Sequence, residues 1–289
     1  MHSEKSPYTL NLHGRLYTIR EPLVMGVINA TPDSFYSGSR ISPAYMASRA
    51  EQMLQEGASI IDIGGCSTRP GAAEIGVEEE WNRLAKPVEA IRKRLPDAIL
   101  SVDTFRSEVA RRCVKEFEVD IINDVSGGTI DSEMFHTIAE LHVPYVLMHS
   151  RGTASTMQSR CNYRDVTADV LSDLAFKDAE LRRLGVSDVI IDPGFGFAKT
   201  TAQNYALLDN LEMFKMIGRP LLVGISRKSM ISRVLGCTPA EALNGTTVIN
   251  TVALMKGASI LRVHDVKEAV ETVKLVGHVF DNSQLIDIK

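Results

Sequence analysis

The sequence has no run of about 18 consecutive apolar residues, the length that a membrane-spanning helix needs. Its first ten residues, MHSEKSPYTL, lack an apolar core of signal-peptide length. The four cysteines are scattered, without a CxxC pair or the spacing of a zinc site. From these absences we expect a cytoplasmic protein whose cysteines are reduced thiols.

The chain also lacks an excess of positive charge, with a formal net charge of −4 and a pI of about 6.0. A broad basic surface that attracts nucleic acid or an anionic membrane is therefore not expected. Any anionic ligand must instead be held by a local group of Arg, Lys and His. With 289 residues, of which 44% are hydrophobic, the chain can form a large core without disulfides.

Neither of the two common nucleotide-binding motifs is present, since the sequence has no GxGxxG and no GxxxxGK[ST]. This absence disfavours an open, doubly wound sheet, which is the competing fold. The chain instead alternates short apolar runs with longer amphipathic stretches. The runs expected to form strands are Leu23–Ile28, Ile60–Ile63, Ile99–Val102, Ile121–Ile122, Tyr145–Met148, Val189–Ile191, Leu221–Val223 and Ile260–Val263.

The amphipathic stretches between the apolar runs predict helices, of which the clearest are Ala44–Gln55, Glu78–Arg94, Ser107–Glu116, Ser132–Leu141, Asp165–Leu184 and Val266–Val276. Helix starts are indicated by Ser42 before Pro43, and by Ser107 with Glu108. Eight strand–helix units predict an α/β fold, a single-domain (β/α)8 TIM barrel over residues 1–289. We expect residues 1–20 to form an N-terminal hairpin extension, with strands Tyr8–Leu12 and Leu16–Ile19 about a turn at His13-Gly14.

A polar residue follows almost every apolar run. In chain order these are Asn29, Asp62, Asp103, Asn123, His149, Asp192, Ser226 and the pair Arg262 and His264. The carboxyl ends of barrel strands meet on one face, so the set predicts a polar bowl there. Any single member could merely cap a helix or tie a loop, particularly Asp62 or His149. The whole set exceeds what loop stability requires.

Several of these segments are suited to binding an anion. Arg262 and His264 are two residues apart, so they should point the same way and could hold a phosphate or diphosphate. Arg69 lies in a turn-prone loop that could close on such a group. The segment 226–229, Ser-Arg-Lys-Ser, should begin a short helix whose amino end suits a carboxylate or phosphate. Lys228 could alternatively form a Schiff base, as in some barrel aldolases.

Other residues are suited to a flat, nitrogen-rich ring. Asp103, Asn123 and Asp192 could pair with the N–H groups of a heterocycle that carries a 2-amino-4-oxo edge. The loop 192–197, DPGFGF, offers glycines for close backbone approach and a phenylalanine for packing on a ring. Asn29 could supply an amide oxygen to Mg²⁺.

Taken together, these segments resemble the dihydropteroate synthase family. The matching motifs are GVINATPDSF (26–35), IIDIGGCSTRPGA (60–72), SVDTFRSEVA (101–110), INDVSGG (122–128), DPGFGF (192–197), GISRKSM (224–230) and LRVHD (261–265). The resemblance implies a pterin-binding TIM barrel. It also implies a transferase of folate synthesis that joins 6-hydroxymethyl-7,8-dihydropterin diphosphate to p-aminobenzoate, releasing diphosphate and 7,8-dihydropteroate.

The resemblance also implies roles for matching residues. The pterin would be bound by Asp103, Asn123, Asp192, Lys228 and Arg262. The diphosphate would be bound by Asn29, Arg69, Arg262 and His264, with Mg²⁺ as cofactor beside Asn29. The p-aminobenzoate would be bound by Thr68, Pro70, Phe197 and Ser229. The residues expected to act in catalysis are Asp103, Lys228 and Arg262.

From the resemblance we further expect a homodimer that binds these small molecules and neither nucleic acid nor membrane. Three alternatives remain: a pterin-dependent methyltransferase, a non-catalytic pterin-binding paralogue and a phosphate-sugar isomerase. The first would not need the STRP, SRK and RVH segments. The second is favoured only by Ser37, which stands where the family often has Asp. Cys66 stands where Glu is frequent, and we expect little loss of function from it.

Overall fold

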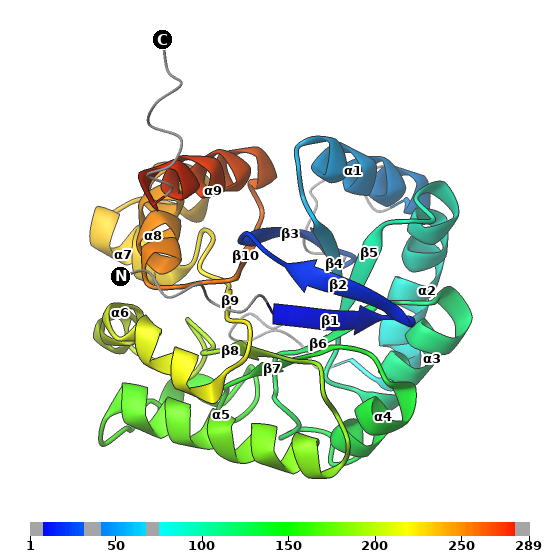
Figure 1. Cartoon of the computed structure of the whole chain (residues 1–289), viewed down its shortest axis with the longest axis horizontal. Coiled ribbons are helices and arrows are strands. Elements are labelled where there is room, and N and C mark those ends of the chain that lie inside the picture. The colour runs from blue at the N-terminus through cyan, green and yellow to red at the C-terminus, as the bar shows by residue number, and fades with distance from the viewer. Residues whose placement is uncertain (1–7, 32–41, 68–74, 281–289) are drawn as a thin grey trace.

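The computed structural model describes residues 8–31, 42–67 and 75–280, and within them it contains a parallel eight-stranded sheet. The strand order is β8-β7-β6-β5-β4-β3-β10-β9. A parallel bridge between Ile191 and Leu221 joins the two outer members of this order, so the sheet closes into a barrel. Helices surround the barrel on all sides (Figure 1). The barrel prediction is confirmed, and the open doubly wound sheet is excluded.

The strands lie close to the predicted apolar runs. They are β3 Leu23–Asn29, β4 Ile60–Gly64, β5 Ile99–Asp103, β6 Ile121–Asp124, β7 Tyr145–Met148, β8 Val189–Asp192, β9 Leu222–Val223 and β10 Ile260–Val263. The α-helices are α1 Pro43–Gln55, α2 Val77–Arg94, α3 Ser107–Phe117, α4 Met134–Leu141, α5 Val166–Arg183, α6 Thr201–Asp209, α7 Ser229–Leu235, α8 Leu243–Met255 and α9 Val266–Phe280. Several strands extend by one or two residues beyond the apolar run, because they include the polar residue that follows it.

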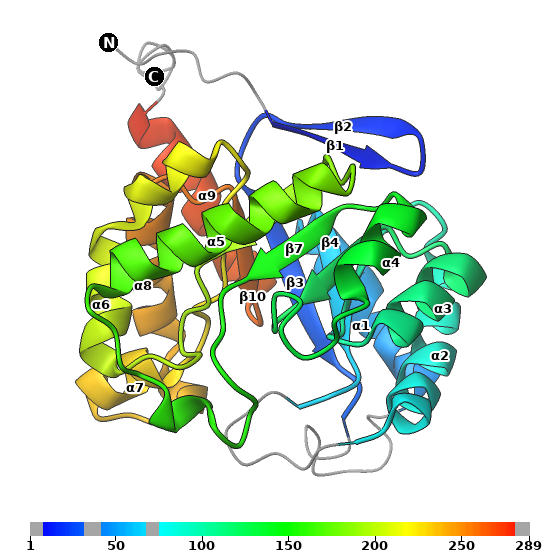
Figure 2. The ribbon, with the colours of Figure 1, turned by 90° about the horizontal axis from the view of Figure 1, so that it is seen from below.

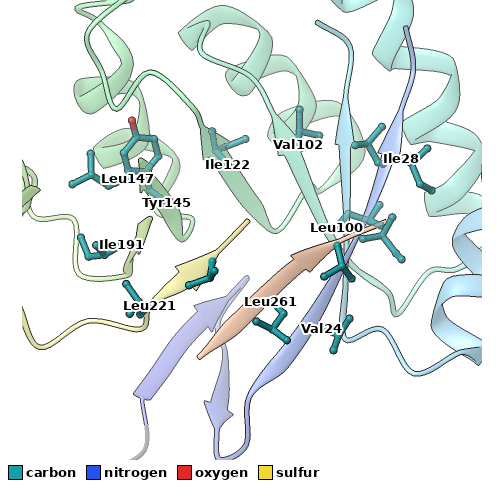
Figure 3. Close-up of a cluster of buried hydrophobic side chains, with 14 of the residues drawn as sticks. Val24, Ile28, Leu100, Val102, Ile122, Tyr145, Leu147, Ile191, Leu221 and Leu261 are labelled. Carbon is teal, nitrogen blue, oxygen red and sulfur yellow. The ribbon is translucent and has the colours of Figure 1, made fainter. Parts of the chain in front are cut away.

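Each barrel strand is apolar on both faces, and alternate residues serve different cores. Residues such as Leu100 and Val102 face outward and pack against the helices, as Figure 3 shows for part of this layer. Residues such as Met25, Ile60 and Val146 face inward and form a second cluster inside the barrel. This division explains why the strands read as continuous apolar runs. The same inward rows continue into the polar residues at the strand ends.

The predicted hairpin closes one end of the barrel. It consists of β1 Tyr8–Leu12 and β2 Arg15–Ile19, joined at His13 and Gly14, which both have positive φ angles. Positive φ at both central residues is the geometry of a type I′ turn, one of the two favoured two-residue hairpin turns. The hairpin's buried side chains join the inner apolar cluster at the amino ends of the strands. Figure 2 shows the hairpin across one end of the barrel, opposite the loops that follow the strands.

Two predicted helix starts have different outcomes. Ser42 caps α1 as expected, since its side chain accepts a hydrogen bond from the backbone N–H of Tyr45. Helix α3 begins at Ser107 as predicted, but Ser107 is its first helical residue and not its cap, and its N–H donates to Asp131 Oδ2 at 2.8 Å. The cap therefore comes from 24 residues away in the chain, which no local pattern could indicate. Among the helices that the structure describes, none is long and apolar enough to cross a membrane.

The role of the hairpin as an apolar lid can be tested with two leucines of the same hairpin. Leu10 is 2% exposed, and Leu16 is 74% exposed. We expect Leu10→Ala to lower the free energy of unfolding by about 2–5 kcal/mol, because it leaves a cavity in the inner cluster. Leu16→Ala should change it by less than about 0.5 kcal/mol. Urea unfolding measures both, and equal losses would contradict the packing described.

Candidate active site

An arginine is held between two buried carboxylates inside the barrel. Arg262 of β10 donates from Nε to Asp62 Oδ2 and from Nη2 to Asp103 Oδ2, each at 2.7 Å. Burial opposes the charge of Arg262, but these two carboxylates outweigh it and hold its pKa above the ordinary value. Burial raises the pKa of Asp103 to about 7, with Asp62 adding to the effect and Arg262 opposing it. The arginine thus stays charged while Asp103 titrates near neutral pH.

Asn123 joins the same group from β6. Its Nδ2 donates to Asp62 Oδ2 at 3.1 Å, so Asp62 accepts from both Asn123 and Arg262. The alternative that Asp62 only caps a helix or stabilises a loop is wrong, because its carboxylate lies fully buried inside the barrel. It sets the positions of two residues that were predicted to bind ligand.

The loop after Asn123 is organised by the next residue. Asp124 accepts hydrogen bonds from the backbone N–H groups of Ser126 and Gly128 and from Tyr145 Oη, at 2.7, 2.8 and 2.7 Å. Gly127 is required here, since a Cβ at this position would lie 2.3 Å from the carbonyl oxygen of Met148. The INDVSGG segment is thus a rigid turn that fixes Asn123.

Asp192 lies at the end of β8, with β7 between it and β6. Its Oδ1 accepts from the N–H of Gly194 at 2.7 Å. Burial raises the pKa of this carboxyl, and the nearby Lys228 opposes the rise. Gly194 has a φ of +72°, and a Cβ there would lie 1.9 Å from the carbonyl oxygen of His149. Only glycine fits this turn because the backbone passes close to that of His149, so Gly194 has a structural role, and a close approach to a ligand stays a prediction.

Lys228 approaches Asp192 from the loop after β9. Its Nζ donates to the carbonyl oxygen of Phe195 at 2.5 Å and lies 4.9 Å from the centroid of the Phe197 ring. Burial lowers the pKa of Lys228 to about 8, and the charge of Asp192 opposes the fall. The two aromatic residues differ in environment, because Phe195 is fully buried in the outer core while Phe197 is half-buried and lines a cleft. Only Phe197 is therefore available to a ligand.

The segments after β9 and β10 are joined by contacts between two successive residues of each segment. Ser226 Oγ lies 3.1 Å from His264 Nδ1 and accepts from the His264 backbone N–H at 3.2 Å. Arg227 forms a two-pronged pair with Asp265, with both distances at 2.8 Å. These contacts hold His264 and Lys228 in the same part of the mouth. His264 is exposed there, while Arg262 points into the barrel.

Helix α7 begins at Ser229, which is exposed, with Lys228 at the capping position. The predicted short helix after the seventh strand is thereby confirmed. Asn29 is the last residue of β3 and is half-buried. It continues the inward row of Met25, since alternate residues of a strand share a face. Thr68, Arg69, Pro70 and Ser37 lie outside the described residues, so their predicted roles stay predictions.

Cys66 and Phe197 line a cleft beside this site, together with Phe105, Arg106 and Met157. Burial raises the pKa of the Cys66 thiol, with the Glu80 carboxylate adding to the effect. This cysteine therefore remains a neutral thiol. Among the residues described, no group of three or more His, Cys, Asp and Glu side chains could hold a metal ion.

Sequence reasoning missed Lys199, and it listed His149 only as a strand-end residue. Lys199 Nζ lies 3.1 Å from His149 Nδ1, and both side chains are buried. Burial lowers the pKa of Lys199 to about 7, and Asp192 opposes the fall. One signal was present in the sequence, because Lys199 is the only Lys or Arg between Arg183 and Lys215.

The pocket can recognise a flat polar ring and an anion at once. Its inner part presents three carboxyl groups and two cationic side chains from five different strands or loops. Carboxylates accept N–H donors, an ammonium donates to ring oxygen or nitrogen, and a guanidinium can pair with an anion. Ser226 Oγ does lie beside His264 Nδ1, but Ser226 is buried and the same oxygen accepts the backbone N–H of His264, so this contact ties two segments together and does not present a nucleophile. The chemistry that fits is displacement assisted by charge.

Comparisons with known proteins agree with this geometry. Residues 25–264 match the family described as pterin binding enzyme. The dihydropteroate synthase of Escherichia coli strain K12 is 42% identical over 266 residues, covering 91% of this chain and 93% of that protein. The structure is similar to the Yersinia pestis dihydropteroate synthase bound to a sulfonamide drug, with a TM-score of 0.88, 37% identity, and coverage of 94% of this chain and 99% of that one. It is also similar to the Xanthomonas albilineans synthase with 4-aminobenzoic acid, with a TM-score of 0.87, 36% identity, and coverage of 95% and 98%.

The buried carboxylate at the centre of the pocket can be tested for its part in stability. We expect Asp62→Ala to lower the free energy of unfolding by roughly 3 kcal/mol, because Arg262 and Asn123 each lose a buried acceptor. The matched control is Asp97→Ala, an exposed position that should change it by less than about 0.5 kcal/mol. Urea unfolding at pH 7 compares the two. Similar losses would show that Asp62 does not hold the pocket together.

Proposed function

Because the chain belongs to the pterin-binding enzyme family and, within it, to the dihydropteroate synthases, we propose that its barrel mouth joins 6-hydroxymethyl-7,8-dihydropterin diphosphate to p-aminobenzoate. The products are 7,8-dihydropteroate and diphosphate, in folate synthesis. The observation that carries this assignment is the charged Arg262 held between two buried carboxylates beside Asn123. It combines ring recognition and anion binding in one pocket.

Pterin recognition uses the inner part of the pocket. Asp192 and Asn123 lie on strands that are separated only by β7, and they take the donors and acceptors of the pyrimidinone edge. Lys228 donates to the ring, and Arg262 lies against its face. A ring without the amino group would leave a buried carboxylate unpaired, so such analogues bind poorly. The pre-formed hydrogen bonds of these side chains support this role, because they hold the groups in place before a ligand arrives.

The reaction breaks the bond between the pterin methylene carbon and the diphosphate oxygen. The electron pair leaves with the diphosphate, so negative charge grows on that group and positive charge grows on the methylene. Arg69, Arg262 and His264 bind the diphosphate, and Asp103 stabilises the positive charge. The amine nitrogen of p-aminobenzoate then forms the new bond to carbon and releases one proton to solvent or diphosphate. An arylamine is neutral at pH 7, so a strong general base is not required.

Magnesium fits this site only as a partner of the diphosphate. Magnesium typically keeps several waters and takes few protein ligands alongside substrate phosphates. The donor set agrees, since Asn29 offers one amide oxygen and the described residues form no acidic metal cluster. When bound, Mg²⁺ would offset charge on the departing diphosphate. Asn29 would hold it, and Arg262 and His264 would hold the same diphosphate from the other side.

The p-aminobenzoate site lies nearer the mouth. Phe197 packs on the aromatic ring, and the carboxylate lies near Ser229 at the start of α7. Thr68 and Pro70 complete the site from the loop after β4. Support comes from the Xanthomonas albilineans synthase, which carries 4-aminobenzoic acid, and from the Yersinia pestis synthase, which carries a sulfonamide drug. Sulfonamides should bind at this same position.

Two features of quaternary state and location belong to the same proposal. The chain forms a homodimer, which would cover exposed apolar side chains of the outer helices, such as Leu235 of α7 and Val248 of α8. It acts in the cytoplasm on small molecules, without nucleic acid or membrane. The chain 1–289 acts as a single barrel with its hairpin at 1–20.

The alternatives fit less well. A methyltransferase would not need the coupled SRK and RVH segments that place Lys228 and His264 together. A phosphate-sugar isomerase would not need the aromatic loop at 192–197. A non-catalytic paralogue remains testable, because it would bind the pterin without turnover. Relatives named as synthases at about 42% identity favour the enzyme.

Turnover of the purified protein tests the proposal directly. With dihydropterin diphosphate, p-aminobenzoate and Mg²⁺, we expect dihydropteroate and diphosphate to form in equal amounts, and chelation of Mg²⁺ to stop their formation. Arg262→Ala should lower kcat/KM by roughly 10²–10³-fold, because it removes a charge that acts on the departing group. Arg94→Ala, a half-exposed control that pairs with Glu51, should stay within about twofold.

Pterin binding without any product would reject the enzyme and leave the binding paralogue. Product formation that Arg262→Ala does not slow would keep the synthase and reject the role given to the arginine.

The pH dependence follows from two buried groups. Burial raises the pKa of Asp103 to about 7, and burial lowers the pKa of Lys228 to about 8. Asp103 must be ionised to stabilise a cation, so kcat/KM should rise through about pH 7. Lys228 must be protonated to donate fully, so kcat/KM should fall above about pH 8. In Asp103→Asn the acid limb should disappear from the residual rate, and its persistence would assign that limb to another group.

A further inference from the structure

The amine of Lys199 is a buried group that the reaction proposed above does not use. Its Nζ donates to the carbonyl oxygens of Gly194 and Phe197 at 2.8 and 3.0 Å, and it lies 3.1 Å from His149 Nδ1. An ammonium has three donors and no acceptor, so these partners match it one for one. None of the three is a carboxylate. The amine therefore holds these three groups in position and does not form an ion pair with them.

His149 is a fixed acceptor for this lysine. Burial lowers the pKa of His149 to about 2, with the charge of Lys199 adding to the effect, so the ring is neutral and Nδ1 can accept. The backbone of His149 is tied to the barrel wall, since its N–H donates to the carbonyl oxygen of Asp192 at 2.9 Å. Lys199 thus connects the wall at the ends of β7 and β8 to the loop that follows β8.

That loop is sharply bent. Gly194, Gly196 and Ala198 have φ angles of +72°, +83° and +49°. The left-handed conformation is unfavourable for Ala198, which carries a Cβ and is buried. A loop of this shape needs contacts that draw it closed. Lys199 supplies them, because it immediately follows Ala198 and bonds back to two carbonyl groups of the same loop.

The closed loop in turn positions the lysine of the site. Lys228 Nζ donates to the Phe195 carbonyl oxygen at 2.5 Å and lies 4.9 Å from the Phe197 ring centroid. Phe195 and Phe197 both lie within the stretch from Gly194 to Phe197 whose two end carbonyls Lys199 holds. A shift of this stretch would move the carbonyl and the ring together.

We infer that Lys199 is a positioning residue that holds the loop after β8 and, through it, sets the p-aminobenzoate side of the site. The inference rests on the proposed synthase function. Lys199 acts through Phe197 and Lys228 without touching the reacting atoms. The backbone of Asp192 is held in the β7–β8 ladder, and Lys228 is only one of five side chains assigned to the pterin. Phe197 supplies the ring contact of the p-aminobenzoate site, so p-aminobenzoate binding depends on Lys199 more than pterin binding does.

The test compares Lys199→Met with Lys177→Met. Lys177 is a suitable control because its side chain is also mostly buried, at 12% exposed, but it pairs with Asp173 on its own helix. We expect Lys199→Met to raise the KM for p-aminobenzoate about tenfold, which corresponds to about 1.4 kcal/mol. Its kcat and its Kd for the pterin diphosphate should stay within about threefold. Lys177→Met should leave all three values within about twofold.

A KM for p-aminobenzoate that stays within twofold in Lys199→Met would overturn the inference, as would an equal rise in Lys177→Met. A loss confined to kcat would also overturn it, because it would place the effect on the chemical step. Turnover by the wild-type protein distinguishes failure of the Lys199 inference from failure of the proposed synthase function. If wild type turns over and the variant behaves like it, only the role of Lys199 fails; if wild type makes no product, the synthase itself fails.

Lys199→Gln serves where the methionine variant does not fold. The shorter amide cannot span His149 and both loop carbonyls, so the same rise in KM is expected. An unchanged KM in a folded Lys199→Gln protein would reject the inference equally.

Discussion

The pocket depends on one electrostatic constraint, the charge of Arg262 enclosed by Asp62 and Asp103. An isolated guanidinium inside a barrel would be very costly, and each carboxylate alone would be costly too. Enclosure of the cation by two anions offsets this cost, and the amide of Asn123 satisfies part of what remains. These four side chains come from four strands, β4, β5, β6 and β10, so the closed barrel is a precondition for the site. Fold and function are linked at this point.

Around that centre, the mouth is built from loops that are themselves fixed by hydrogen bonds to backbone groups. Asp124 organises the turn after β6, and the fork between Arg227 and Asp265 ties the segments after β9 and β10. Lys199 does the same for the loop after β8. These loops are held before any ligand binds, which is the arrangement expected where charge must be stabilised without reorganisation.

The sequence predicted the barrel well because alternate residues of each strand serve two apolar cores, which leaves continuous apolar runs with a polar end. It predicted the residues at those ends, including Asp103, Asn123 and Asp192, because the carboxyl ends of parallel strands converge. It could not predict the contacts between distant loops. A purely structural role for Asp62 as a helix cap or loop contact was left open, and it was wrong. Arg262 lies 200 residues away in the chain, and only the closed barrel brings it to Asp62. Lys199 was missed because two of its three partners are backbone carbonyls and the third, His149, lies 50 residues away in the chain, so no local pattern indicates these contacts.

The hairpin has a consequence for the order in which molecules enter and leave the pocket. Its leucines and the inner apolar cluster fill the barrel at the amino ends of the strands, so the described part of the pocket is closed at that end. A molecule that rests on the Arg262 level must enter before one that rests on Phe197, nearer the opening. It must also wait for the outer molecule to depart, unless the two have been joined into one. With the pterin at the level of Arg262 and p-aminobenzoate beside Phe197, as proposed above, the shape of the pocket gives the two substrates a fixed order of binding.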